Sequence, residues 1–192
     1  MAGNFDQTWK RVAIGLALAS VAWFLYDGLL GQRDPALDAQ SAADRAFEDG
    51  DYDRALSLYR ERTVVEAENA YALRGIALSL MQLGRDDEAL SAFAVAINAE
   101  PDFGGAYANR GILHDRMGSH EQAAADYRRA LELDAELADG PHWMTRFLRN
   151  QPDKPPTIAD RLGYLEVELA KSPEERVLSV PEADAEQRQY QQ

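Results

Sequence analysis

Apolar residues in the middle of the chain recur at intervals of three and four positions, which is the spacing of one buried face of an α-helix. Two such patterns follow each other between residues 70 and 103, formed by Leu73, Ala77 and Leu80 and then by Ala89, Phe93, Ala96 and Ile97. Gly84 separates the two patterns, as a glycine free to adopt positive φ at a helix end would. The stretch therefore predicts a helical hairpin, in which small residues let the two helices approach closely and Phe93 fills the space between them.

The same arrangement repeats every 34 residues between residues 36 and 135. Glycines stand in one column, and alanines, aromatics and small residues stand in three more: Gly50, Gly84 and Gly118; Ala55, Ala89 and Ala123; Tyr59, Phe93 and Tyr127; Ala43, Ala77 and Gly111. A single hairpin cannot bury its apolar face alone, so successive copies stack into a solenoid. The sequence predicts a repeat region at 37–135, with hairpins at about 37–65, 70–99 and 104–134.

This repeat resembles the tetratricopeptide repeat, which carries small residues, glycine, alanine, an aromatic and proline at fixed positions. The middle unit matches that pattern at Ala77, Gly84, Ala89, Phe93, Ala96 and Pro101. In the third unit Ala135 stands where proline is expected, and in the first unit Arg62 and Ala67 replace the last two signature residues. The resemblance covers about half the chain. It implies an all-α, right-handed solenoid of three hairpins, but it says almost nothing about the ligand.

The part of the chain after the third hairpin predicts a cap for the open end of the solenoid. Residues 138–171 begin where a fourth repeat would start but depart from its pattern, and we interpret them as a degenerate capping hairpin, which repeat arrays need for solubility. The second helix of this hairpin, at 157–171, is amphipathic, and Thr157 with Asp160 offers an N-terminal cap. We expect residues 172–192 to form a flexible tail.

Residues 12–30 are almost wholly apolar and follow a polar leader at 1–11. Nineteen helical residues span roughly 28 Å, about the thickness of one hydrocarbon core. We expect an uncleaved transmembrane signal anchor here, joined to the repeats by a linker at 31–36. A cleaved signal peptide would share the basic start and the apolar run, but the run is long for one and no convincing cleavage site follows it. A buried core helix is the third alternative, although the repeats already supply their own core.

The charges that flank the apolar segment predict its orientation. Lys10 and Arg11 precede it, whereas Asp27 and Asp34 bracket only Arg33 after it. The positive-inside rule then places the N-terminus in the cytoplasm and the repeats on the other side. We therefore expect a single-pass protein of a bacterial inner membrane, with the repeats in the periplasm.

The balance of charges argues against a nucleic-acid partner. The chain has 33 acidic and 20 basic residues among its 192, for a formal net charge of −13, and phosphate neutralisation needs a basic face. The absence of cysteine excludes disulfides and thiolate chemistry.

Candidate metal and catalytic motifs are weak. His114, His120 and His142 lack a metal-ligand spacing. Asp49, Gly50 and the nearby aspartates resemble the start of a calcium loop, but Gly50 occupies the hairpin-turn column and the distal glutamate of an EF-hand is missing. With no phosphate loop, nucleophile elbow or nucleotide fingerprint either, we expect a non-enzymatic protein with no metal and no cofactor.

The resemblance implies a protein-binding groove lined by the first helix of each hairpin. The residues at the groove positions are Asp44 and Phe47; Tyr71, Arg74, Leu78 and Met81; Asn109, Ile112 and Arg116; and, if the cap continues the curve, His142, Trp143 and Arg146. Apolar and arginine side chains suit an extended peptide or a helix, with arginines meeting carboxylates. A solvated face and binding at the convex face are the alternatives.

One known activity of the family is disfavoured by the residues at these positions. The carboxylate clamp that grips the C-terminal peptides of cytosolic chaperones expects lysine and asparagine in the first unit. Gln40 and Asp44 stand there instead, and Gly75 occupies the following clamp position.

Two functional hypotheses follow. The first is a membrane-anchored scaffold or adaptor that binds proteins or peptides and assists the assembly, maturation or folding of envelope proteins. The alternative is a stoichiometric structural subunit of a membrane complex, contacting it through the transmembrane helix and the tail. A secreted adaptor released by signal cleavage is a third possibility.

Overall fold

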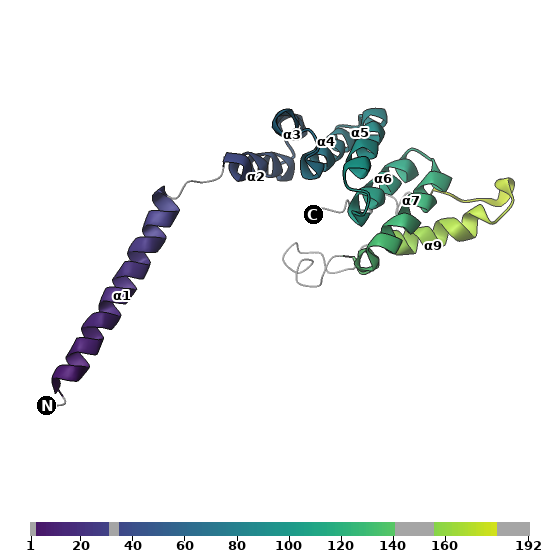
Figure 1. Ribbon diagram of the computed structural model, residues 1–192. Helices are drawn as coiled ribbons and strands as arrows, with labels where there is room; N and C mark the ends of the chain where they lie inside the picture. The colour runs from purple at the N-terminus through teal and green to yellow at the C-terminus, as the bar shows by residue number, and fades with distance from the viewer. Residues whose placement is uncertain (1–2, 31–34, 141–155, 180–192) are drawn as a thin grey trace. The chain divides into compact units, whose positions relative to one another are not determined.

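The structure is a computed structural model that describes residues 3–30, 35–140 and 156–179 (Figure 1). The chain divides into two units, Met1–Asp38 and Ala39–Gln192. The first unit contains helix α1, Gly3–Leu30, and the beginning of α2. The second contains the repeats, and each unit is considered separately.

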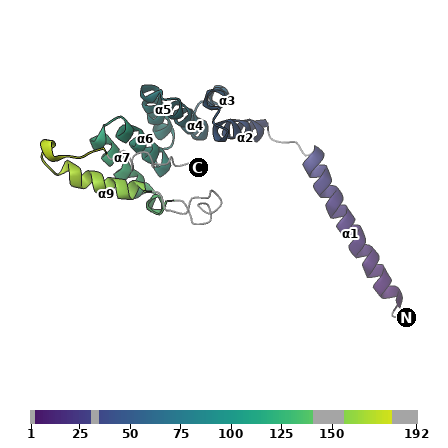
Figure 2. The same cartoon turned by 180° about the vertical axis from the view of Figure 1, so that it is seen from behind.

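The described part of the chain is all-helical, which confirms the predicted class of fold. After α1 the elements are α2 (Pro35–Glu48), α3 (Tyr52–Val65), α4 (Ala70–Gln82), α5 (Asp86–Ala99), α6 (Gly104–Arg116), α7 (His120–Leu133), the 3₁₀ turn η1 (Ala135–Ala138), α9 (Ile158–Leu169) and the 3₁₀ turn η2 (Pro173–Glu175). Consecutive helices from α3 to α7 pack against each other in chain order, as the two views of the ribbon show (Figures 1 and 2).

The glycine column marks the turn inside each hairpin. Gly50, Gly84 and Gly118 have φ of +79°, +69° and +77°, a region that costs other residues energy. At the middle turn the amide of Arg85 donates to the carbonyl of Leu80 over 3.0 Å, which closes the end of α4. The predicted role of these glycines is confirmed.

The core lies between the helices of each hairpin and between successive hairpins. Phe93 and Tyr127 have no exposed surface, and each fills the space that the small column leaves in the helix before it. The fit is tight at Gly111, because a β-carbon there would lie 2.7 Å from the ring of Tyr127. The small and aromatic columns are therefore two halves of one packing contact.

Helix α9 packs on α7, the last helix of the third hairpin (Figure 2). Thr157 and Asp160 cap its first turn reciprocally, each side chain accepting from the other's backbone amide. A buried ion pair holds the helix: Arg161 donates through Nε and Nη2 to both oxygens of Asp115 over 2.6 and 2.8 Å. Residues 141–155 of the predicted capping hairpin and the tail beyond 179 lie outside the described residues.

The prediction of a membrane-spanning helix at 12–30 is wrong, and with it the predicted bacterial inner-membrane location and the periplasmic placement of the repeats. Within the residues that the structure describes, no helix is long and apolar enough to cross a membrane. In the sequence, Arg11 and Asp27 bound an uncharged stretch of only 15 residues, shorter than the about 20 that a span needs.

Candidate functional site

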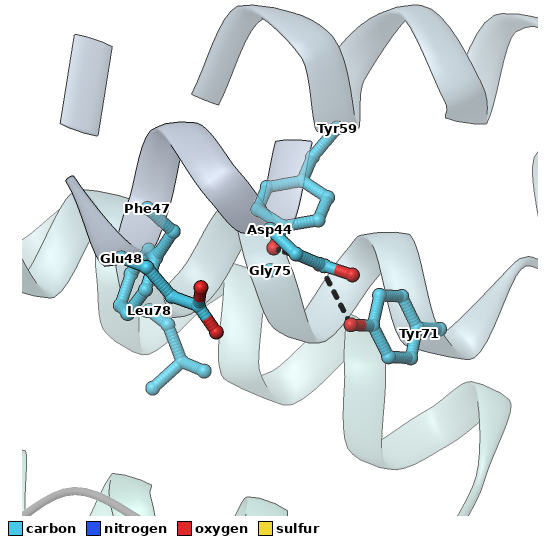
Figure 3. A pocket seen from close by; sticks show the side chains of 7 residues that line it. All are labelled: Asp44, Phe47, Glu48, Tyr59, Tyr71, Gly75 and Leu78. Carbon is cyan, nitrogen blue, oxygen red and sulfur yellow. Dashed lines mark hydrogen bonds between the residues drawn. The ribbon is translucent and has the colours of Figure 1, made fainter. Parts of the chain in front are cut away.

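A pocket of about 220 Å³ opens in the first two hairpins, between α2, α3 and α4 (Figure 3). It is lined by Asp44, Phe47, Glu48, Tyr59, Tyr71, Gly75 and Leu78. We refer to these seven residues as the α2–α4 pocket. Its volume lies below the about 300–1,000 Å³ of most small-molecule sites, so it suits one side chain better than a cofactor.

Asp44 is the polar centre of the pocket. The hydroxyls of Tyr59 and Tyr71 both donate to its Oδ1, each over 2.7 Å, from helices α3 and α4. The two rings lie 6.4 Å apart, centroid to centroid, at an angle of 58°. Three helices of two successive hairpins are thus joined through one carboxylate oxygen, while the structure describes no hydrogen bond to its Oδ2.

The two tyrosines titrate abnormally because of this arrangement. Burial and the hydrogen bond to Asp44 raise the pKa of Tyr71 to about 12. The same two causes, burial first, raise the pKa of Tyr59 well above its usual range. Both hydroxyls therefore stay protonated, and donate, at any physiological pH.

The back of the pocket depends on the absence of a side chain at Gly75. The ring of Tyr59 lies against this glycine so closely that a β-carbon would approach it to 2.6 Å. The glycine therefore allows Tyr59 to lie flat between α3 and α4 and to reach Asp44 with its hydroxyl.

The apolar wall comes from Phe47 and Leu78, which are 9% and 8% exposed. Phe47 is fixed by an edge-to-face contact with Tyr52, with ring centroids 5.3 Å apart. Glu48 is exposed at the rim, one turn along α2 from Asp44, and the structure describes no ion pair for it. Hydroxyls, carboxylates and an apolar wall thus surround one small pocket.

The structure brings together four of the predicted groove residues: Asp44, Phe47, Tyr71 and Leu78 all line the pocket. Arg74, which we expected to meet a ligand carboxylate, is paired instead within the chain. Its guanidinium binds Glu100 and lies 4.1 Å from the centroid of the Phe103 ring.

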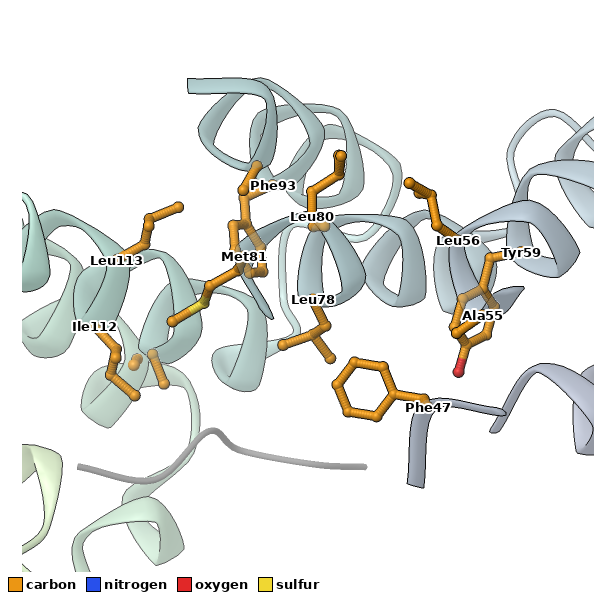
Figure 4. Close-up of a cluster of buried hydrophobic side chains, with 14 of the residues drawn as sticks. Phe47, Ala55, Leu56, Tyr59, Leu78, Leu80, Met81, Phe93, Ile112 and Leu113 are labelled. Atoms are coloured by element: carbon orange, nitrogen blue, oxygen red, sulfur yellow. The ribbon is translucent and has the colours of Figure 1, made fainter. Parts of the chain in front are cut away.

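The remaining predicted groove residues do not join the pocket. Met81, Asn109 and Ile112 are 1%, 3% and 2% exposed, and Figure 4 shows Met81 and Ile112 within the cluster of buried side chains. Arg116 is exposed at the end of α6. The predictions for His142, Trp143 and Arg146 fall outside the described residues.

Sequence reasoning missed Glu48, Tyr59 and Gly75 as lining residues. Tyr59 stands in the aromatic column, which predicts a core residue, and it is indeed 6% exposed. Its hydroxyl was the available signal, because a buried tyrosine needs a hydrogen-bond partner and a phenylalanine stands at this position in the next unit.

The described histidines lie beside single aspartates. His120 Nδ1 lies 2.8 Å from Asp115 Oδ1, and His114 Nε2 lies 3.9 Å from Asp126 Oδ2. Burial lowers the pKa of His114, which favours its neutral form. A metal site is not found in the described part of the chain. Over residues 3–30, 35–140 and 156–179 no group of three histidine or carboxylate side chains is placed to hold a metal ion. Asp51, one of the aspartates beside Gly50 that resemble the start of a calcium loop, instead caps α3 by accepting from the amide of Arg54 over 3.2 Å.

Comparison with known proteins identifies the repeats. The tetratricopeptide repeat matches residues 41–106 and again residues 105–136. A rice (Oryza sativa subsp. japonica) protein, "Protein SGT1 homolog", is 29% identical over 136 residues, which is 71% of this chain. The chain spans about a third, 35%, of the length of that relative.

Solved structures share the fold at low identity. The first repeat domain of Spaghetti (RPAP3), bound to the HSP90 peptide SRMEEVD, aligns with a TM-score of 0.55 at 21% identity, over 71% of this chain and 94% of that one. The type III secretion translocator chaperone SycD of Yersinia enterocolitica aligns with a TM-score of 0.58 at 14% identity, over 73% and 98%. At these identities the likeness shows the fold alone.

Proposed function

We propose that this chain, which carries tetratricopeptide repeats over residues 41–136, binds a segment of another protein at its α2–α4 pocket. In this function it acts as a non-enzymatic adaptor that holds a partner protein during assembly, maturation or folding. The observation that carries the proposal is the pocket itself, formed by the first helices of two successive hairpins together with α3.

The shape and chemistry of the pocket support a protein segment as the ligand. An apolar wall of Phe47 and Leu78 stands beside the hydrogen-bonded carboxylate of Asp44. A few fixed polar groups on an apolar wall are what orient a bound segment. The tyrosine hydrogen bonds hold the site in place before binding, which lowers the entropy lost when a partner associates.

The similarly folded proteins are consistent with this proposal. The Spaghetti (RPAP3) domain is named for a bound HSP90 peptide, and the Yersinia protein is named as a translocator chaperone. Both names describe proteins that hold another polypeptide. We extend that general role to this chain, and we do not extend either ligand.

The proposal is tested by photo-crosslinking from the rim of the pocket. A photoreactive amino acid replaces Glu48 in the full chain, and extract of the native cells is irradiated with it. Glu61 is the matched control, because it is an exposed glutamate on α3 in a separate hollow with Arg60 and Val64. We expect discrete adducts from position 48 that are absent from position 61, each mapping to one segment of the partner by mass spectrometry.

Two results would contradict the proposal. One is the absence of adducts from position 48 while the variant remains folded by circular dichroism. The other is an identical set of adducts from positions 48 and 61, because non-specific collisions do not distinguish the two sites.

A further inference from the structure

Among the residues that the structure describes, the charged side chains that line the α2–α4 pocket are all negative. Asp44 and Glu48 are the charged residues among the seven that line it. Arg74 lies 5.9 Å from the centroid of the Tyr71 ring, but its charge is matched by Glu100 and its guanidinium lies over Phe103. A ligand entering the pocket therefore meets two carboxylates and no cation from the lining.

The pocket has carboxylate oxygens that can still accept a hydrogen bond from a ligand. Both tyrosine hydroxyls donate to the same oxygen of Asp44, Oδ1. Its Oδ2 and the carboxylate of Glu48 carry no hydrogen bond among the described residues. A ligand that donates satisfies these oxygens, whereas an anionic ligand adds like charge.

The walls of the pocket suit the rest of a basic side chain. The methylene stem of a lysine or arginine is apolar and packs well on Phe47 and Leu78. The rings of Phe47 and Tyr71 also line the pocket, and aromatic rings attract an ammonium or guanidinium group at their faces.

A second aspartate of the chain, Asp115, is in a comparable environment and is paired with an arginine. Asp115 also accepts from a tyrosine of the aromatic column, Tyr127, over 3.3 Å. There, Arg161 of the capping helix completes the carboxylate with two further hydrogen bonds. In the α2–α4 pocket none of the seven described lining residues is basic, so none takes that place.

We propose that the α2–α4 pocket binds a lysine or arginine side chain of the partner segment, with its charge between Asp44 and Glu48 and its stem against Phe47 and Leu78. The inference rests on the proposed function, because it names the chemistry of the segment that the same pocket takes. An acidic C-terminus such as the SRMEEVD peptide of the similar structure does not fit, since its carboxylates would face Asp44 and Glu48.

The test uses short end-blocked peptides with one central residue between leucines. The central residue is lysine, norleucine or glutamate, so that length and apolar content stay matched. Each peptide is titrated into the full chain and the amide shifts are followed by NMR. We expect the lysine peptide to shift the amides of Asp44, Tyr71 and Leu78 and to bind about tenfold more tightly than the norleucine peptide. The glutamate peptide should bind most weakly.

Charge-neutral variants separate a specific site from the general attraction of an acidic protein. Asp44→Asn with Glu48→Gln should weaken lysine-peptide binding roughly tenfold. Glu61→Gln removes a charge outside the pocket and should change binding by less than about twofold. Equal losses in the two cases would overturn the proposal, as would unchanged binding in the pocket variant.

The remaining outcomes distinguish this inference from the proposed function. If the norleucine peptide binds at the pocket as tightly as the lysine peptide, the inference that the pocket recognises a cation is wrong. The pocket is then still a peptide-binding site. A lysine peptide that shifts no pocket amide overturns the inference, and if position 48 also yields no crosslinks, the proposed function fails with it.

Discussion

Two aspartates of the repeat region accept hydrogen bonds from tyrosines, and they differ in the other groups that bind their carboxylates. Asp115, near the C-terminal end, is 7% exposed and is closed by Arg161 and His120 of neighbouring helices. Asp44, near the N-terminal end, is partly exposed and accepts from two tyrosine hydroxyls, and within the described part of the chain no cation pairs with it. The first aspartate therefore belongs to a closed contact between elements, and the second to an open site.

The difference shows how one kind of contact can serve either stability or binding. A buried carboxylate is costly unless a cation and further donors satisfy it. At Asp115 the chain supplies these from α9, and the result is a fixed capping helix. At Asp44 two neutral donors suffice because the pocket stays open to solvent, and the capacity for a cation remains unused.

The largest expected effect comes from breaking the closed site. Arg161→Met removes the cation and leaves Asp115 charged and buried, which should lower the free energy of unfolding by about 3–5 kcal/mol. Urea unfolding measures this. Arg128→Met is the control, because Arg128 pairs with Glu166 at half-exposed positions over 2.8 Å and should cost no more than about 1 kcal/mol. An equal decrease in the free energy of unfolding in the two variants would show that the buried ion pair stabilises the fold no more than the exposed one.

The next effect concerns the packing behind the open site. Gly75→Ala places a β-carbon against the ring of Tyr59, 2.6 Å away in the present geometry, and should destabilise by about 1–3 kcal/mol. Gly163→Ala is the matched change in α9, where nothing lies within 4 Å of a β-carbon. It should stabilise by about 0.5–1 kcal/mol through helix propensity. Thermal unfolding of the two variants should therefore shift in opposite directions.

A smaller effect tests the hydrogen bonds to Asp44. Asp44→Asn keeps an acceptor oxygen but removes its charge, and should cost about 0.5–1.5 kcal/mol. It should also lower the pKa of Tyr71 from its value of about 12, as followed by tyrosinate absorbance. An unchanged Tyr71 titration would mean that burial alone raises its pKa.

The raised pKa of Tyr71 also predicts the direction of a pH effect on stability. A tyrosine whose pKa is about 12 when folded and 10.0 in its ordinary state stabilises the fold fully below pH 10. That contribution is lost as the pH rises from 10 towards 12. In the Asp44→Asn variant the loss should occur over a narrower range of pH, which denaturant titration at several pH values measures.

The smallest effect on stability comes from supplying the missing cation. Glu48→Lys places a lysine one turn after Asp44 on α2, an arrangement worth about 0.3–0.5 kcal/mol. It imitates within the chain what Arg161 provides at Asp115. We expect nearly unchanged unfolding but loss of lysine-peptide binding, and retained binding would show that the pocket does not recognise charge.

Local spacing was sufficient to predict the hairpins, because their helices, turns and small–aromatic contacts are set by residues within one repeat. Gly84 and the cap at Thr157 are examples, since each acts on its own helix end. The prediction of a membrane span was wrong because it relied on the hydropathy of residues 12–30 and gave too little weight to the charges at Arg11 and Asp27.

The pocket was predictable only in part. Repeat positions placed Asp44 and Tyr71 in one predicted groove, and the structure brings them into hydrogen-bond contact. Repeat positions did not indicate how deeply each side chain is buried, so Met81 was expected to contact a ligand although it is buried. They also did not indicate that Glu100 would pair with Arg74, or that Arg161 would reach Asp115, because those partners lie 26 and 46 residues away.

The 46 residues from Arg116 to Arg161, which follow Asp115 in the chain, have a consequence for the order in which the protein is made. At about 5–20 residues per second, a ribosome needs roughly 2–9 s to add them. Once α7 is complete at Leu133, and until Arg161 is added, the nascent chain carries a third hairpin whose aspartate has not yet met its arginine. The end of the array is therefore the last part of the domain to mature, and a message truncated between codons 134 and 161 would yield a polypeptide that can build its hairpins but lacks the arginine that pairs with Asp115.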